Sequence, residues 1–241
     1  MTQMFISDLH LDPSLSSLNK GFLHFLQTEA QSAKHLYILG DLFELWLGDD
    51  HITKFSKSIT DALSALPGRV FLMHGNRDFL IGERFCREAN ATLLKDPTII
   101  DTPAGAALVL HGDSLCTRDK PYMEARQKLR SRQFQKQFLA KGLEDRAIIA
   151  KQIRGESRSL KRETAMDIMD VTPKEVVRVL RDNKVSIMIH GHTHRPAVNS
   201  LTVDGKVATR YVLGDWGQTM QYLVIDGKQP RLMSYDVGIP E

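Results

Sequence analysis

Seven side chains that suit metal coordination occur in five short clusters along the chain. The last cluster, HGHTHRP, begins at His190 and holds three histidines within five residues. The seven candidate ligands are two carboxylates, one amide and four imidazoles: Asp8, His10, Asp41, Asn76, His111, His192 and His194. Oxygen and nitrogen donors without a thiolate favour Mn²⁺, Fe²⁺ or Zn²⁺ over a soft-metal site. Seven donors are too many for one such ion and suit two ions that share a bridging carboxylate.

Short apolar runs precede these clusters and predict buried strands. The runs are MFIS, LYIL, VFLM, ALVL and VSIMI. Helical patterns lie at 18–33, 52–66 and 173–183, so strands and helices alternate as in an α/β fold. In α/β sheets, ligands bind at the carboxyl ends of strands, where the five clusters would converge. The D-x-H and H-x-H spacings would place each pair on one face of a strand end. After residue 197 a hairpin signal at Asp204-Gly205 predicts a β-rich end.

Composition limits the class of protein. The chain has 241 residues, 42% of them hydrophobic and 25% charged, which fits one large globular domain or a domain with an insertion. No apolar run reaches about 18 residues, so we expect no membrane span. The first residues, MTQMFISDLH, show no signal-peptide pattern, which favours the cytoplasm. Cys86 and Cys116 form no C-x-x-C pair and are interpreted as structural.

The net charge of +3 is unevenly distributed. Residues 117–165 hold 14 Lys and Arg against 6 Asp and Glu, a net of +8, which leaves −5 for the remainder. This segment has no strand pattern, and we predict a helical cap at 117–165 inserted into a core formed by 1–116 and 166–241. Its charge indicates either a solvated helical face or a surface for phosphates, nucleic acid or acidic lipid.

The clusters together resemble the calcineurin-like metallophosphoesterase superfamily. They read DLH (8–10), GDLFE (40–44), GNRD (75–78), HGD (111–113) and GHTH (191–194), in the family's order. The resemblance implies a two-sheet β-sandwich flanked by helices. It implies that Asp41 bridges two metals, that Asp8, His10 and His194 complete one site, and that Asn76, His111 and His192 complete the other. His190 is interpreted as an inward-facing structural histidine.

Arg77 stands where many members of the superfamily carry a histidine that assists an alkoxide leaving group. The pKa of arginine exceeds about 12, so Arg77 cannot donate a proton usefully, but it can stabilise charge on phosphate oxygens. A phosphate monoester, with a second pKa near about 6, needs little protonation to leave. Arg77 therefore favours pyrophosphate cleavage over alkyl phosphomonoester hydrolysis. The alternative is that Arg77 only pairs with Asp78 or Glu83.

Longer stretches are similar to the UDP-2,3-diacylglucosamine diphosphatase family of lipid A biosynthesis in Gram-negative bacteria. They are ILGDLFELWLGDD (38–50), HGNRDFLIG (74–82), HGDSLCTRD (111–119), IMDVTP (168–173) and IHGHTHRPA (189–197). The resemblance implies hydrolysis of UDP-2,3-diacylglucosamine to lipid X (2,3-diacylglucosamine 1-phosphate) and UMP, with two Mn²⁺ per chain and activated water attacking the α-phosphorus. It further implies peripheral association with the anionic cytoplasmic face of the inner membrane. Separately, we expect a monomer and no nucleic acid partner.

The same resemblance assigns roles to particular residues. The catalytic residues would be Asp41, Asn76, Arg77 and His192. Substrate contacts would come from Asn76, Arg77, Asp119, Ser157, Lys161, Thr164 and His192. The chain departs from the family pattern at two of these positions. Lys161 replaces an amide or hydroxyl residue and Thr164 replaces a lysine, so the basic contact is expected from Lys161 or Arg162.

The apolar residues of the insertion fit an acylated substrate, although packing within the cap explains each of them equally well. These residues are Phe134, Phe138, Ile148 and Ile149. Two other functions remain open. The first is another dimetal phosphoesterase acting on nucleotides or nucleic acid, against which the insertion lacks interleaved arginine and aromatic residues. The second is a non-catalytic scaffold on the same fold, against which all seven ligand types are present.

Overall fold

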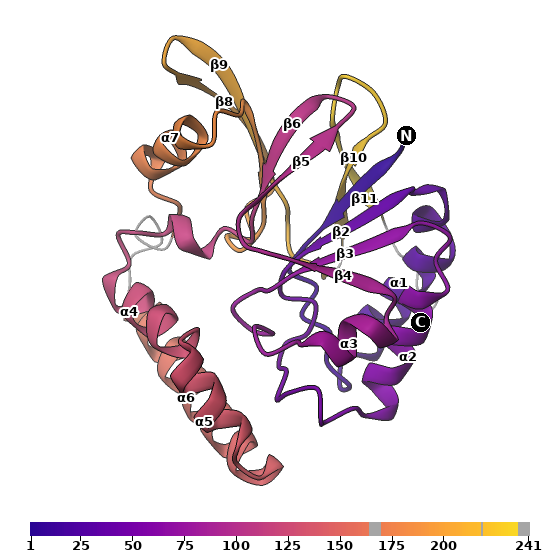
Figure 1. Cartoon of the computed structure of the whole chain (residues 1–241), viewed down its shortest axis with the longest axis vertical. Helices are drawn as coiled ribbons and strands as arrows, with labels where there is room; N and C mark the ends of the chain where they lie inside the picture. Colours follow the sequence, from indigo (N-terminus) through magenta and orange to yellow (C-terminus); the bar gives the residue numbers. More distant parts are fainter. Residues whose placement is uncertain (164–169, 218, 236–241) are drawn as a thin grey trace.

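The computed structural model describes residues 1–163, 170–217 and 219–235, except for the side chains of 156–163. The described strands form two sheets (Figure 1). The larger sheet has the order β11-β10-β1-β2-β3-β4, with β1 (Gln3–Ile6), β2 (His35–Leu39), β3 (Arg69–Met73), β4 (Ala91–Leu94), β10 (Met220–Ile225) and β11 (Arg231–Tyr235). The smaller sheet has the order β5-β6-β7-β9-β8, with β5 (Thr98–Thr102), β6 (Gly105–Val109), β7 (Ile187–His190), β8 (Ala197–Val203) and β9 (Lys206–Val212).

Alternate residues of the central strands enter two different cores. Phe5 and Leu39 point into the space between the sheets, where they join Val109 and Ile189. Met4 lies in the core beneath the helices on the outer face of the larger sheet. Because both faces of these strands are covered, their sequences read as continuous apolar runs. The predicted two-sheet sandwich flanked by helices is therefore confirmed.

Helices cover the outer face of each sheet. On the larger sheet they are α1 (Ser16–Gln27), the 3₁₀ helix η1 (Glu29–Ser32), α2 (Lys54–Ser64) and α3 (Glu83–Glu88). Thr53 begins α2 with a capping box, in which its hydroxyl accepts from the Ser56 N–H at 3.1 Å. On the smaller sheet α7 (Pro173–Asp182) packs Val176 and Leu180 against the strands. The helices predicted at 18–33, 52–66 and 173–183 are present with shifted ends.

Three helices follow the short 3₁₀ helix η2 (Asp113–Leu115), and we call them the helical cap. They are α4 (Lys120–Leu129), α5 (Arg132–Leu139) and α6 (Leu143–Glu163). They extend from one end of the sandwich (Figure 1). The chain enters and leaves the cap through neighbouring residues, because Thr172 donates its N–H to the Leu115 carbonyl at 2.8 Å. The division into core and cap at residues 117 and 165 remains a prediction.

The strands that precede the five polar clusters run in parallel within their sheets. β1, β2 and β3 are parallel neighbours, and so are β6 and β7. Their carboxyl ends therefore lie at the same end of the sandwich, on the side from which the cap extends (Figure 1). Among the described helices, none combines the length and the hydropathy required of a membrane span.

Candidate metal centre

The metal-ligand candidates lie on loops in the left-handed backbone region. The φ angles are 56° at Asp8, 51° at His10, 54° at Asp41, 68° at His192 and 54° at His194. The prediction that each pair, Asp8 with His10 and His192 with His194, shares a face of a strand end is wrong, because β1 ends at Ile6 and β7 ends at His190. Left-handed backbone is unfavourable for residues with a side chain and is concentrated at functional sites. Five candidate ligands adopt this conformation, which indicates that some stability of the fold is lost in order to direct their side chains towards the centre.

Close backbone contacts require glycine beside two of the carboxylates. A Cβ atom on Gly75 would lie 2.0 Å from Asp41 Oδ1, and one on Gly191 would lie 2.1 Å from Asp8 Oδ2. Without side chains there, the Arg77 N–H donates to Asp41 Oδ1 at 2.8 Å and the His192 N–H donates to Asp8 Oδ2 at 2.7 Å. Each carboxylate is thus held by one oxygen, and its other oxygen faces the centre.

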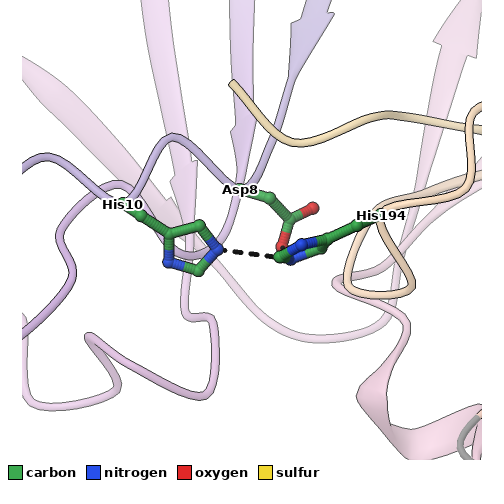
Figure 2. Close-up of side chains that lie close together, drawn as sticks. All are labelled: Asp8, His10 and His194. Atoms are coloured by element: carbon green, nitrogen blue, oxygen red, sulfur yellow. Dashed lines mark hydrogen bonds and ion pairs between the residues drawn. The ribbon is translucent and has the colours of Figure 1, made fainter. Parts of the chain in front are cut away.

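One group of donors contains Asp8, His10 and His194 (Figure 2). The Nε2 atoms of the two histidines are 3.3 Å apart, and His194 Nε2 is 3.5 Å from Asp8 Oδ1. Atoms that bind one ion at about 2.0–2.1 Å are themselves separated by about 3 Å, so these distances fit a common ion. Asp8 Oδ1 is buried and has no hydrogen-bond partner in the described structure, which is unfavourable unless a cation faces it.

A second group gathers around the side-chain oxygen of Asn76. His192 Nδ1 lies 2.9 Å from Asn76 Oδ1, and His111 Nε2 lies 3.1 Å from the same atom. Asp41 Oδ2 stands between the two groups, 3.8 Å from His111 Nε2 and 4.0 Å from His10 Nε2. The seven residues predicted as ligands are therefore brought together, with Asp41 in the position that a bridging carboxylate requires.

Two histidines at the centre, His111 and His194, carry raised pKa values in the metal-free protein, whereas burial lowers the pKa of His10. Burial by itself lowers the pKa of His111, but Asp41 and Asp8 outweigh it and raise the pKa to about 9. Burial is likewise outweighed at His194, where the facing carboxylates of Asp215 and Asp8 raise the pKa to about 9. Burial raises the pKa of Asp41, and nearby carboxylates add to the effect. The centre therefore holds concentrated negative charge that attracts protons or other cations.

His190 lies outside the donor set, as predicted. Its side chain is fully buried, and its Nδ1 lies 2.9 Å from the Gly191 carbonyl oxygen. Burial lowers the pKa of His190 to about 4, so the neutral form persists at neutral pH. A neutral imidazole that packs beneath the ligand loop is a structural residue.

Residues outside the predicted set hold the ligand loops in place. The buried Asp78 carboxylate accepts from the N–H groups of Gly75 at 2.8 Å and Leu42 at 2.8 Å, which ties the second ligand loop to the third. Asp215 Oδ2 lies 3.4 Å from His194 Nδ1. Asp78 stands in the quoted GNRD motif, and Asp215 follows β9 in a GDW sequence. Its position directly after a strand was the one feature of the sequence that could have indicated a role for Asp215.

A cavity of about 340 Å³ opens beside the centre and is lined by both core and cap. Asn76, Arg77, His192 and His194 line it from the core. The cap contributes mainly apolar side chains: Pro121, Ala125, Leu129, Phe134, Phe138, Ala150 and Ile153. The centre thus faces both a polar wall and an apolar chamber.

The predicted substrate contacts are placed unequally. Arg77 and Asp119 line the cavity, and Asp119 also begins α4 by accepting from the Tyr122 N–H at 3.1 Å. In the described part of the chain Arg77 forms no ion pair and its buried Nε has no hydrogen-bond partner, so the alternative pairing with Asp78 or Glu83 is not observed. The side chains of Ser157 and Lys161 lie outside the described residues, and so does Thr164.

The four apolar cap residues that the sequence analysis singled out lie in different environments. Phe134 and Phe138 stack at 5.8 Å between ring centroids and line the cavity. Ile149 packs against the core beneath the outer helices. The interpretation that Ile148 and Ile149 serve an acylated substrate is not supported, because neither side chain lines the cavity and Ile148 is 57% exposed.

A buried carboxylate fastens the first cap helix to the core, and the sequence prediction missed its role. Asp113 Oδ2 accepts from Arg126 Nε at 2.8 Å, from the Tyr122 hydroxyl at 3.1 Å and from Arg130 Nη2 at 3.2 Å. Arg130 Nη2 also donates to the Gly75 carbonyl at 3.1 Å, beside the Asn76 ligand loop. Since α4 has no buried residue of its own, these polar contacts position it.

Known proteins place this centre in a family. A model of the calcineurin-like phosphoesterase family matches residues 1–196. The chain belongs to the calcineurin-like phosphoesterase family. Proteins of this family bind divalent metal ions, and two sets of carboxylate and imidazole donors fit that chemistry: Asp8, His10 and His194, and Asp8, Asp41 and His111. Vps29 of Entamoeba histolytica, solved in complex with Zn²⁺, has a TM-score of 0.51 and 14% identity over 100% of this chain and 95% of its own, which shows the shared fold.

Within the family, the chain is similar to proteins named UDP-2,3-diacylglucosamine hydrolase. The protein from Pseudomonas aeruginosa is 48% identical over 96% of this chain and 98% of its own length. The protein from Marinobacter nauticus is 47% identical over 95% of this chain and 96% of its own length. The similarity thus extends through the cap as well as the phosphoesterase core.

Proposed function

We propose that this phosphoesterase hydrolyses the pyrophosphate bond of UDP-2,3-diacylglucosamine to UMP and 2,3-diacylglucosamine 1-phosphate. The observation that carries the proposal is that Asn76, His192 and His194 of the donor groups line a cavity with a polar wall and an apolar chamber. A diphosphate substrate with acyl chains requires both surfaces. Relatives that are 47–48% identical over almost the whole chain and are named for this activity support the same substrate.

Two divalent cations, taken to be Mn²⁺, complete the proposed site. Asp8, His10 and His194 would hold one ion and Asn76, His111 and His192 the other, with Asp41 shared between them. When bound, such a pair of ions makes water nucleophilic at neutral pH and neutralises phosphate charge. Carboxylate, amide and imidazole donors suit Mn²⁺.

Arg77 and Asn76 supply the polar contacts to the diphosphate. Arg77 faces the cavity with its Nε unpartnered, so its guanidinium has donors available for phosphate oxygens. It stabilises the charge that develops on the departing sugar phosphate, which leaves without being protonated. His192 and Asn76 border the same end of the cavity and help to orient the reacting phosphate. Attack on the α-phosphorus then gives UMP and the lipid phosphate.

The cap binds the remainder of the substrate in this proposal. Phe134, Phe138 and Leu129 line the apolar chamber and contact the acyl chains. Asp119, at the start of α4, and Ser157, on α6, contact the glucosamine. Lys161 or Arg162 supplies the basic group, and Thr164 lies beside them in sequence.

The outer surface of the cap suits contact with an anionic membrane. Ile148 is 57% exposed, Leu139 39% and Leu143 38%, and the segment 117–165 carries a net charge of +8. Exposed apolar side chains among basic residues favour peripheral binding to acidic lipids. We therefore place the protein, as a monomer, at the cytoplasmic face of the inner membrane, where its lipid substrate is available. No nucleic acid partner is expected.

A panel of two UDP-sugars and a simple phosphodiester tests the proposal. The Mn²⁺-loaded protein is given UDP-2,3-diacylglucosamine, UDP-N-acetylglucosamine and an aryl phosphodiester, and release of UMP or of the aryl alcohol is measured. We expect rapid release of UMP from the acylated substrate alone. Equal turnover of all three would retain a dimetal phosphodiesterase and contradict the lipid substrate. No turnover by metal-loaded protein would favour the scaffold alternative.

A further inference from the structure

Histidine ligands usually donate the N–H that faces away from the metal to a fixed acceptor, which sets the ring's tautomer and orientation. Two histidines of this centre show the pattern. His111 Nδ1 lies 2.9 Å from the Leu39 carbonyl oxygen, and His194 Nδ1 lies 3.4 Å from Asp215 Oδ2. In both rings Nε2 then faces the other donors. His10 directs its Nε2 inward in the same way, 3.3 Å from His194 Nε2 (Figure 2).

The outward nitrogen of His10 faces a carboxylate that no role described above includes. His10 Nδ1 lies 3.1 Å from Glu44 Oε2. This nitrogen is buried and makes no well-aligned hydrogen bond within the described residues, so Glu44 is the acceptor within reach of its N–H. The side chains of His10 and Glu44 are 17% and 20% exposed, which limits competition from water.

The second oxygen of Glu44 contacts the cap. Arg154, on α6, forms an ion pair with Glu44 Oε1, and the Arg154 side chain is 21% exposed. Glu44 and Arg154 both line the cavity proposed for the substrate. Glu44 is therefore held from two sides, by a candidate metal ligand of the core and by a cation of the cap.

We propose that Glu44 is a positioning residue that holds His10 in the metal-binding tautomer, and that Arg154 fixes the Glu44 carboxylate from the cap. Accepting the Nδ1 proton leaves the Nε2 lone pair directed towards Asp8 and His194. The cap thereby influences the ion held by Asp8, His10 and His194, across a chain of contacts that begins in the substrate cavity. The inference rests on the proposed metal centre and is independent of which lipid the protein hydrolyses.

Metal binding to the full-length protein tests the role of Glu44 without measuring activity. Metal-free protein is titrated with Mn²⁺, and free Mn²⁺ is followed by electron paramagnetic resonance for the wild type, Glu44→Gln and Glu44→Ala. Loss of such an outer partner typically weakens metal binding by about 10–100-fold. We expect Glu44→Ala to weaken one of two Mn²⁺ sites by at least about 10-fold. Glu44→Gln keeps an acceptor oxygen but loses the charge. Its Mn²⁺ affinity should therefore lie between that of Glu44→Ala and that of the wild type.

The outcomes separate this inference from the proposed function. Two unchanged Mn²⁺ sites in both variants, with wild-type circular dichroism, would overturn the role of Glu44 and leave the metal centre intact. Equal weakening of both sites would also overturn it, because the ion pairs of the Glu44 carboxylate within the described residues are with His10 and Arg154 and not with Asn76 or His111. Failure of the wild type to bind Mn²⁺ would contradict the metal centre and the inference together.

Two substitutions of Arg154 separate positioning from simple charge. Arg154→Gln removes the cation, whereas Arg154→Lys keeps it and loses the planar group that grips a carboxylate. If Arg154 positions Glu44, both variants weaken the same Mn²⁺ site, and neither has a further effect in the Glu44→Ala background. If only charge matters, Arg154→Gln tightens Mn²⁺ binding and Arg154→Lys leaves it unchanged, which would overturn the role of Arg154.

The control is a second ion pair between cap and core. Arg146, on α6, contacts the Asp50 carboxylate at 2.6 Å and 2.8 Å, away from the donor groups. Asp50→Asn weakens this attachment of the cap without touching Glu44, so Mn²⁺ affinity should remain at the wild-type value. Weakening as large as that in Arg154→Gln would show that general loosening of the cap, and not Glu44, is responsible.

Discussion

Asn76 Oδ1 lies between two imidazole nitrogens, 2.9 Å from His192 Nδ1 and 3.1 Å from His111 Nε2. An uncharged amide oxygen at this point completes a set of three donors that arrive from loops after β3, β6 and β7. We predict that Asn76→Ala reduces bound Mn²⁺ from two ions per chain to one and lowers kcat by at least about 100-fold. Metal analysis after gel filtration gives the stoichiometry. Two tightly bound ions in the variant would contradict the assignment.

Gly75 provides the space that the bridging carboxylate requires. In Gly75→Ala the new methyl group would overlap Asp41 Oδ1, which lies 2.0 Å from the ideal Cβ position. We expect this variant to lose most Mn²⁺ binding, because Asp41 would have to move. Gly142→Ala is the matched control, since no heavy atom lies within 4 Å of its Cβ position. Similar Mn²⁺ affinity in the two variants would show that the close approach at Gly75 has no function.

Metal binding should release protons. His111 and His194 have pKa values of about 9 in the metal-free protein, above the ordinary 6.5, so both are charged at pH 7. A coordinating imidazole must be neutral, and Mn²⁺ affinity should therefore rise with pH until about 9. Calorimetry at pH 7 in buffers of different ionisation enthalpy should give a release approaching about two protons. Binding with no net release would contradict these pKa values.

The same two histidines should make the stability of the metal-free protein depend on pH. A raised pKa in the folded state stabilises the fold fully below pH 6.5, and this contribution is lost as pH rises to about 9. The unfolding midpoint in EDTA should therefore fall between pH 6.5 and 9. With saturating Mn²⁺ the decrease should be absent or reversed, because the ion replaces the protons.

Much of the centre was predictable from the sequence because its donors follow apolar runs that predict strands. That Asp41 and Asn76 lie together could be inferred from the rule that the carboxyl ends of parallel strands lie at the same edge of a sheet. The left-handed backbone at Asp8, His10 and Asp41 was not predictable in this way, because it accompanies backbone hydrogen bonds between loops distant in sequence. The strands β4 and β5 were missed, since their half-buried faces leave no continuous apolar run.

The supporting carboxylates were harder to predict than the ligands. Glu44 and Asp113 were visible as motif residues, but their roles depend on cap residues that the fold brings to them. Glu44 meets Arg154 across 110 positions of sequence, and Asp113 meets Arg130 across 17. Because an arginine-rich segment offers many possible partners, the pattern alone cannot choose among them. The structure shows that Arg154 pairs with Glu44 and that Arg130 pairs with Asp113.

Asp113 should contribute both to stability and to substrate binding. Its carboxylate is fully buried and holds Arg126 and Arg130, whose side chains are 21% and 19% exposed. We expect Asp113→Ala to lower the free energy of unfolding by roughly 1–3 kcal/mol, since partial exposure lets water relieve the unpaired arginines. The KM for the acylated substrate should also rise, because α4 lines the cavity. Asp182→Asn removes an exposed ion pair of α7 and should cost under about 1 kcal/mol. An equal decrease in the free energy of unfolding in both variants would contradict the role of Asp113 in anchoring α4.

The central claim is that water attacks the α-phosphorus of UDP-2,3-diacylglucosamine at this centre. The most direct measurement is a single turnover of that substrate by the Mn²⁺-loaded protein in H₂¹⁸O, with both products examined by mass spectrometry. The account predicts one ¹⁸O atom in UMP and none in 2,3-diacylglucosamine 1-phosphate. Label in the lipid phosphate would contradict the proposed site of attack, and no cleavage of the acylated substrate would contradict the proposed function.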